Sequence, residues 1–133
     1  MTLEPWYLTG MVELAGSFTY SRSDRNVVPY FAIKLRNDEG GILDDVQAHF
    51  GGAGRQYALK GSHPGPRSRY YRVTRIQDLD LIVQHFDDYP LRGRKAAAYT
   101  IWRELVSLKR QGYRKPEREK IEKLCTSLSA ALR

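Results

Sequence analysis

The chain contains very little cysteine and no long hydrophobic run. Its 133 residues include a single cysteine, Cys125, so an internal disulfide cannot form and a reducing compartment is expected. A run of about 18 apolar residues, as a membrane span would need, is missing, as is a signal-peptide pattern at the start. We therefore expect an intracellular protein, in the cytoplasm, the nucleoid or an organelle matrix, with no membrane partner. Cys125 is expected to be a small buried side chain.

The familiar signatures of nucleotide, redox and hydrolase sites are also missing. The sequence has no Cys-x-x-Cys pair, no Walker A loop and no Gly-x-Ser-x-Gly turn. Its three histidines, His49, His63 and His85, do not have the spacing of metal ligands. A glycine-rich stretch at 51–54 follows a predicted helix and precedes a predicted strand, the reverse of the order in a phosphate-binding loop. The sequence therefore predicts no histidine metal site and no nucleotide cofactor.

Positive charge is what the chain has in excess. Lys and Arg number 22 against 15 Asp and Glu, a net charge of +7. Hydrophobic residues make up 41% and charged residues 28%, the balance of a globular chain with a core. The length predicts one domain over 1–133. A domain this basic is typical of proteins that bind nucleic acid, although charge alone also fits an ordinary basic protein.

The hydrophobic pattern predicts a repeated helix-strand-strand order. Pro5 suits the first turn of an N-terminal helix, which Gly16 ends, and alternating residues then predict two strands. A second helix, with Asn37 as its expected cap, and two shorter strands follow, and three helices complete the chain. This order predicts an α+β fold of repeated α-β-β units, with a four-stranded antiparallel sheet backed by helices and free on its other face. The expected strands are 17–22, 27–36, 55–60 and 67–74, and the later helices 37–50, 76–85, 92–110 and 116–132.

Two segments resemble one known family. Residues 8–16 read LTGMVELAG, which resembles the LAGLIDADG motif of the homing endonucleases. Residues 82–91, IVQHFDDYPL, and the basic cluster of Arg92, Arg94 and Lys95 also resemble segments of that family, in the same order. Through these segments, the chain resembles the single-motif LAGLIDADG homing endonucleases over most of its length.

The resemblance implies how the protein would assemble and what it would bind. One motif per chain implies a homodimer through the motif helix, in which Gly10 allows close approach because it has no side chain. The two sheets would then form a saddle in the major groove of a pseudo-palindromic double-stranded DNA site. The implied dimer interface comprises Trp6, Gly10, Met11 and Leu14. The residues implied to face DNA are Ser17, Thr19, Ser21, Tyr30, Lys34, Arg55, Tyr57, Lys60, Tyr70 and Arg72.

The resemblance fails at the position that matters most for cleavage. The eighth motif position carries the acid that binds a divalent metal, usually Mg²⁺, and in this chain it is Ala15. Leu35 stands where the family has a polar residue, often Gln, and Arg94 where it has Lys, with Lys95 adjacent. An arginine does not transfer protons near neutral pH. We therefore expect DNA binding with impaired or lost cleavage, and no bound metal.

Two alternatives remain open. An active endonuclease could use Mg²⁺ with a displaced acid such as Glu13 or Asp24. Glu13 precedes Ala15 by two residues in the motif, and because each helical step rotates a side chain by about 100°, Glu13 is expected to point elsewhere and serve the scaffold. The other alternative is an intron RNA-binding maturase, since some relatives bind structured RNA.

Overall fold

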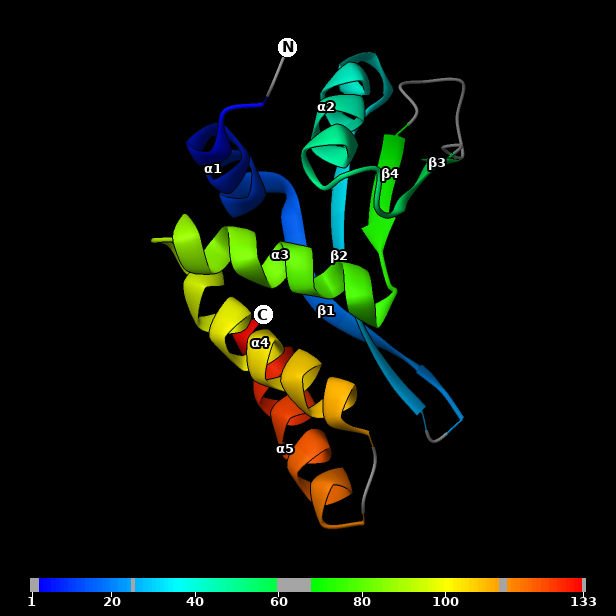
Figure 1. Cartoon of the computed structure of the whole chain (residues 1–133), viewed down its shortest axis with the longest axis vertical. Helices are drawn as coiled ribbons and strands as arrows, with labels where there is room; N and C mark the ends of the chain where they lie inside the picture. Colours follow the sequence, from blue (N-terminus) through cyan, green and yellow to red (C-terminus); the bar gives the residue numbers. More distant parts are fainter. Residues whose placement is uncertain (1–2, 25, 60–67, 113–114, 133) are drawn as a thin grey trace.

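The computed structural model describes residues 3–24, 26–59, 68–112 and 115–132, and its element order is the predicted one (Figure 1). The chain passes twice through a helix followed by two strands and ends in three helices. The elements are α1 Pro5–Ala15, β1 Gly16–Ser23, β2 Asn26–Arg36, the 3₁₀ turn η1 Asn37–Glu39, α2 Gly41–His49, β3 Arg55–Leu59, β4 Ser68–Val73, α3 Ile76–Asp88, α4 Lys95–Gln111 and α5 Lys115–Ala131.

Helix boundaries differ from the prediction in three places. Helix α3 continues three residues beyond His85, to Asp88, and α4 begins at Lys95 instead of Arg92. The backbone of Arg92 is held by a carboxylate of α1, described below, so it lies in a loop and not in a helical turn. The expected cap at Asn37 is also wrong, because Asn37 begins the 3₁₀ turn and α2 starts after Gly40 without a side-chain cap.

The four strands form one antiparallel sheet in the order β1-β2-β4-β3. In the register, Phe18 lies opposite Phe31, and Phe31 lies opposite Val73 on the other side. These buried residues face the helices, and their neighbours in each strand face the opposite way. Helix α3 crosses the sheet, α4 and α5 pair beside it, and the β1–β2 hairpin extends beyond α3 (Figure 1).

An aromatic cluster fixes the helices to the sheet. The Phe18 ring centroid lies 5.2 Å from that of Phe86 on α3 and 5.1 Å from that of Tyr99 on α4. The indole nitrogen of Trp102 donates hydrogen bonds to the carbonyl oxygens of Thr19 and Tyr30, at 3.0 and 3.1 Å. Because one α4 side chain bridges β1 and β2, the hairpin is held rigidly against the helical layer.

The motif helix α1 is attached to the other helices by a buried hydrogen-bond chain. Thr9 donates its hydroxyl proton to the Tyr89 carbonyl oxygen at 2.9 Å, so it accepts from Nε2 of His85 at 3.1 Å. Nδ1 of His85 in turn lies 3.0 Å from Nε2 of His49 on α2. Burial, and then the neighbouring His49, lower the pKa of His85 to about 4. His85 is thus neutral at neutral pH, and its ring links α3 to α1 and α2.

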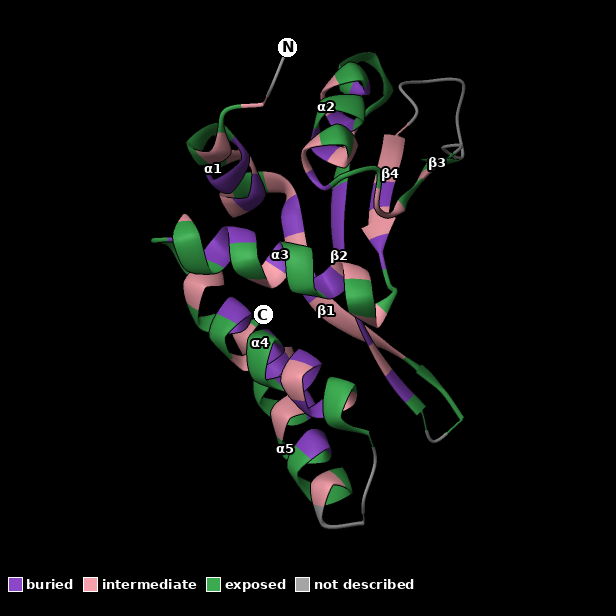
Figure 2. Cartoon of the chain, in the orientation of Figure 1, coloured by how far each residue is buried: buried purple, intermediate pink, exposed green. Residues whose placement is uncertain are grey.

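Figure 2 shows where the chain is exposed: the end of the β1–β2 hairpin and the outer sides of the helices are green, and the sides that meet are purple. Cys125 on α5 is fully buried, as predicted. Within the described residues, no helix is both long and apolar enough to cross a bilayer.

Candidate nucleic-acid interface

The residues predicted to face DNA lie together on the face of the sheet that the helices leave free. The register places Thr19 opposite Tyr30, Lys34 opposite Tyr70, and Arg55 opposite Arg72. The described members of this outer face are Ser17, Thr19, Ser21, Tyr30, Lys34, Arg55, Tyr57, Tyr70 and Arg72. Lys60 lies outside the described residues.

Arginine and tyrosine side chains on this face are held in fixed positions. The Arg72 guanidinium carbon lies 3.9 Å from the centroid of the Tyr30 ring, a cation–π contact. The Nε atom of Arg72 is buried, and it has no hydrogen-bond partner in the described part of the chain. Burial, and then a hydrogen bond with Tyr30, raise the pKa of Tyr70 to about 12. The Tyr70 phenol therefore stays neutral, and the guanidinium of Arg72 carries positive charge on this part of the face.

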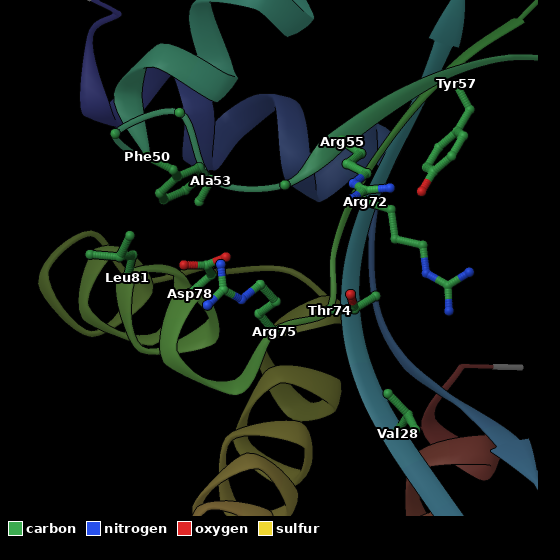
Figure 3. A pocket seen from close by; sticks show the side chains of 13 residues that line it. Val28, Phe50, Ala53, Arg55, Tyr57, Arg72, Thr74, Arg75, Asp78 and Leu81 are labelled. Atoms are coloured by element: carbon green, nitrogen blue, oxygen red, sulfur yellow. The ribbon is translucent and has the colours of Figure 1, made fainter.

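Arg55 and Arg72 place two positive charges directly opposite each other on adjacent strands, an arrangement that is destabilising without an anion. Both residues line a hollow of about 780 Å³ at the end of the sheet, between the glycine-rich α2–β3 connection and the first turns of α3 (Figure 3). Arg75 and Asp78 point toward each other from the α3 side of this hollow (Figure 3). The hollow extends the basic face around the end of the sheet.

Sequence analysis missed Arg75. It lies two residues after the end of β4 and immediately before the first residue of α3, and this position at a strand-helix junction was the available signal. The glycine-rich stretch connects the end of α2 to the start of β3, the order that the sequence predicted. Gly51, Gly52 and Gly54 have positive φ angles of 68°, 88° and 87°, so they turn the chain sharply between α2 and β3.

Ala15, the position of the missing acid, is the last residue of α1 and lines a second hollow of about 230 Å³. Ser17, the first outward-facing residue of β1, lines the same hollow, as do Arg94 and Lys95. Gly16 makes this tight connection possible, because a Cβ atom there would lie only 2.6 Å from Val12 Cγ1. The end of the motif helix, the basic cluster and the start of the outer face therefore meet at one point.

Arg94 and Lys95, the two residues of the basic cluster that line this hollow, both contact main-chain carbonyl oxygens. The Lys95 ammonium donates a hydrogen bond to the Val12 carbonyl oxygen at 3.0 Å, and a guanidinium nitrogen of Arg94 lies 3.5 Å from the carbonyl oxygen of Leu132. Burial, and then the charge of Arg94, lower the pKa of Lys95, which the Glu13 carboxylate partly offsets. The structure thus places both residues beside Ala15.

Glu13 is engaged elsewhere. Its carboxylate accepts hydrogen bonds from the backbone nitrogen of Gly93, at 3.0 and 3.1 Å, and from that of Arg92 at 3.2 Å. These bonds clamp the α3–α4 connection against α1. Glu13 does not line the hollow beside Ala15.

Two other residues named for catalysis lie away from Ala15. Leu35 is on the helix-covered face of β2, packed against the core, and does not line the hollow. Asp24 is exposed at the far end of β1, with φ of 57°. Eight strand residues separate Asp24 from Ala15, which is about 26 Å of extended chain.

The groups around Ala15 do not fit the divalent metal that the resemblance implies. Mg²⁺ is held by carboxylate and other oxygen ligands. The polar side chains lining the hollow are those of Ser17, Arg94 and Lys95, with no carboxylate among them. Among the described residues, no group of three or more His, Cys, Asp or Glu side chains could hold a metal ion.

Helix α1 exposes an apolar strip on the side away from the core. The exposed fraction is 49% for Trp6, 54% for Tyr7 and 88% for Leu14. A Cβ atom at Gly10 would meet nothing within 4 Å, and Met11 is half-buried. We call Trp6, Tyr7, Gly10 and Leu14 the α1 strip. A protein this size seldom leaves such side chains uncovered together.

The fold and these sites define a class: a LAGLIDADG-type α-β-β domain, with its motif helix leading into a basic sheet face. The family model described as LAGLIDADG endonuclease matches residues 8–106, more than half of the chain. The chain therefore belongs to the LAGLIDADG endonuclease family. It is 31% identical, over 80% of its length, to the "Uncharacterized 50.9 kDa protein in ND4 intron 1" of Podospora anserina. It spans only 24% of that relative's length.

Solved structures show the same fold. The LAGLIDADG meganuclease I-CpaMI bound to uncleaved DNA is 26% identical with a TM-score of 0.73, over 83% of this chain and 38% of its own. The homing endonuclease I-TnaI is 21% identical with a TM-score of 0.79, over 99% of this chain and 97% of its own. The shared fold thus occurs both as part of a longer chain and as nearly the whole of one.

Proposed function

We propose that the protein binds double-stranded DNA through the outer face of its sheet and that its cleavage activity is impaired or lost. The observation that carries the binding proposal is the register, which gathers Lys34, Arg55 and Arg72 with three tyrosines on the one face that no described helix covers. A two-stranded β-ribbon fits the major groove, where each base pair presents a distinct pattern of donors and acceptors. I-CpaMI, a relative with the same fold, was solved bound to DNA.

Impaired cleavage rests on Ala15. The motif's remaining carboxylate, that of Glu13, is held by the backbone nitrogens of Arg92 and Gly93. This supports a scaffold role for Glu13 and weighs against an endonuclease that uses it as a displaced ligand. Asp24, about 26 Å along the strand from Ala15, has no route to the same phosphate.

The proposed assembly is a pair of such domains packed through the α1 strip. Gly10 leaves room for a facing helix, and the apolar side chains around it supply the buried area. A homodimer would read a pseudo-palindromic site. The alternative to a homodimer is pairing with a second domain of one longer chain, an arrangement for which the Podospora relative is long enough.

Binding is tested by selecting duplexes from a randomised 40-base-pair library on the immobilised protein, in EDTA, with matched enrichment from a structured intron RNA pool. We expect an enriched duplex whose binding is reduced more than tenfold in Lys34→Ala/Arg72→Ala. The matched control is Lys120→Ala/Arg103→Ala, which removes two cations from helices on the other side of the sheet. Enrichment of RNA alone would favour the maturase alternative and contradict the proposal.

A further inference from the structure

The hollow beside Ala15 carries positive charge where the resemblance predicts a metal ion. Lys95 and Arg94 line it, and the nearest acid, Glu13, is engaged with backbone nitrogens of the α3–α4 connection. An anion entering from the outer face would therefore meet two cations and no carboxylate.

Lys95 is fixed as a donor. One of its three ammonium protons bonds the Val12 carbonyl oxygen at 3.0 Å, in the last turn of α1, where the helix dipole also favours a cation. The two remaining protons have no acceptor within the described residues. A partly buried ammonium without a carboxylate partner is costly, and an anionic ligand would offset that cost.

The hollow is continuous with the proposed DNA-binding face. Ser17 lines it and is also the first residue of β1 to face outward, so its hydroxyl lies at the junction. The volume of about 230 Å³ is several times the ~30 Å³ share of one water molecule, which leaves space for a phosphate group.

We propose that this hollow binds a phosphate of the DNA backbone directly, through Lys95 and Arg94, with no metal ion between protein and DNA. The inference rests on the proposed function and deepens it. A phosphodiester oxygen accepts the free Lys95 protons while Arg94 supplies a second charge-assisted hydrogen bond. Loss of the acid at Ala15 thereby converts a metal-dependent contact into a metal-independent one.

The test measures the dissociation constant of the selected duplex by fluorescence anisotropy at matched ionic strength, in EDTA and in CaCl₂. Wild type should bind equally well in both. Lys95→Met should weaken binding about tenfold and lower the magnitude of the salt slope by about 0.9, the loss of one phosphate contact. Lys95→Arg should bind nearly as well as wild type. Lys123→Met, which removes an exposed cation from α5, is the matched control and should change neither quantity.

A second variant keeps the proposal testable if Lys95→Met fails to fold. Ala15→Asp places a carboxylate against the incoming phosphate, so it should weaken binding in EDTA and regain affinity in CaCl₂. If wild type binds no duplex, the proposed function itself fails, and this inference with it. If wild type binds but both Lys95→Met and Ala15→Asp behave like Lys123→Met, DNA binding stands and the phosphate site is overturned.

Discussion

At the scale of single residues, neighbouring positions of one motif serve different purposes. Glu13 holds the α3–α4 connection through backbone nitrogens, whereas Ala15, two residues later, faces a hollow with cations and no carboxylate. The helical rotation of about 100° per residue explains why one acid cannot replace the other. The scaffold function of the motif is therefore retained where its metal ligand is missing.

Restoring a carboxylate at position 15 tests whether the missing metal ligand is the cause of lost cleavage. Ala15→Asp returns a carboxylate to the eighth motif position, and Arg94→Lys returns the lysine that the resemblance implies beside it. We expect the double variant to cut the selected duplex in Mg²⁺ orders of magnitude faster than wild type, because metal stabilisation of transition-state charge is worth several kcal/mol. Gel analysis of end-labelled duplex measures the rate. A double variant that binds the duplex but cuts no faster than wild type would count against Ala15 as the cause of lost cleavage.

The buried His85 predicts how stability depends on pH. Its pKa is about 4 in the folded protein and about 6.5 when unfolded, so the unfolded state takes up the proton first as pH falls. The free energy of unfolding should fall between pH 6.5 and pH 4, by up to about 3 kcal/mol, and level off for this group below pH 4. The lowered pKa of His49 acts in the same direction.

Urea unfolding at half-unit pH steps measures this dependence. His85→Gln, which keeps hydrogen-bonding capacity but does not titrate, should be less stable at pH 7 and should show a flatter profile between pH 6.5 and pH 4. A wild-type profile that is flat over this window would contradict a buried neutral His85.

At the scale of elements, α1 has two unlike sides. Leu8 and Val12 pack into the core, and the Thr9 hydroxyl joins the buried histidine chain, whereas the α1 strip is exposed. A side chain at Gly10 would touch nothing in the isolated domain. A substitution there should therefore affect pairing of the domains without affecting folding.

Gly10→Leu should therefore leave the domain folded and weaken its pairing. We expect a shift toward monomer in sedimentation equilibrium at micromolar concentration, with unchanged circular dichroism. Gly41→Leu, at an exposed glycine of α2 that is equally unobstructed, is the matched control and should leave pairing intact. A wild-type protein that is monomeric under these conditions and still binds its duplex at full strength would contradict pairing of this chain through α1.

The sequence predicted the elements well where a hydrophobic period was strong. The alternation in β2 separates Phe31 and Leu35 from Tyr30 and Lys34, and in the structure the first pair faces the helices and the second pair the free side of the sheet. Long-range contacts could not be predicted, since no local pattern reports them. The start of α4 depends on a carboxylate from α1, about 80 residues earlier, and the hollow lined by Arg75 depends on where the sheet meets α3.

At the scale of the whole molecule, the net charge of +7 is divided between two sides. On the helical side, Arg22, Arg103 and Arg110 pair with Glu122, Asp87 and Asp80. On the outer sheet face, Arg55 and Arg72 lie opposite each other, and no ion pair is seen there among the described residues. The outer face thus carries cations that no described carboxylate neutralises.

This distribution predicts steep salt dependence of DNA binding. A protein that meets about 6 to 10 phosphates loses ~10³ to 10⁵ in affinity between 50 and 200 mM salt. Anisotropy titrations of the selected duplex at four salt concentrations measure the slope. Lys34→Ala/Arg72→Ala should reduce its magnitude, whereas a flat wild-type titration would contradict the assignment of the outer face.

The most direct test of the account is whether the unmodified protein cuts the duplex it binds. The selected duplex, at saturating protein, is incubated with Mg²⁺ and separately with Mn²⁺, and both strands are followed on a denaturing gel. Our account predicts that wild type binds the duplex and leaves both strands intact, because Ala15 provides no metal ligand and Glu13 is held by the backbone nitrogens of Arg92 and Gly93. Metal-dependent cleavage of both strands by wild type that disappears in Glu13→Gln would contradict it, and would make Glu13 the working acid of an active endonuclease.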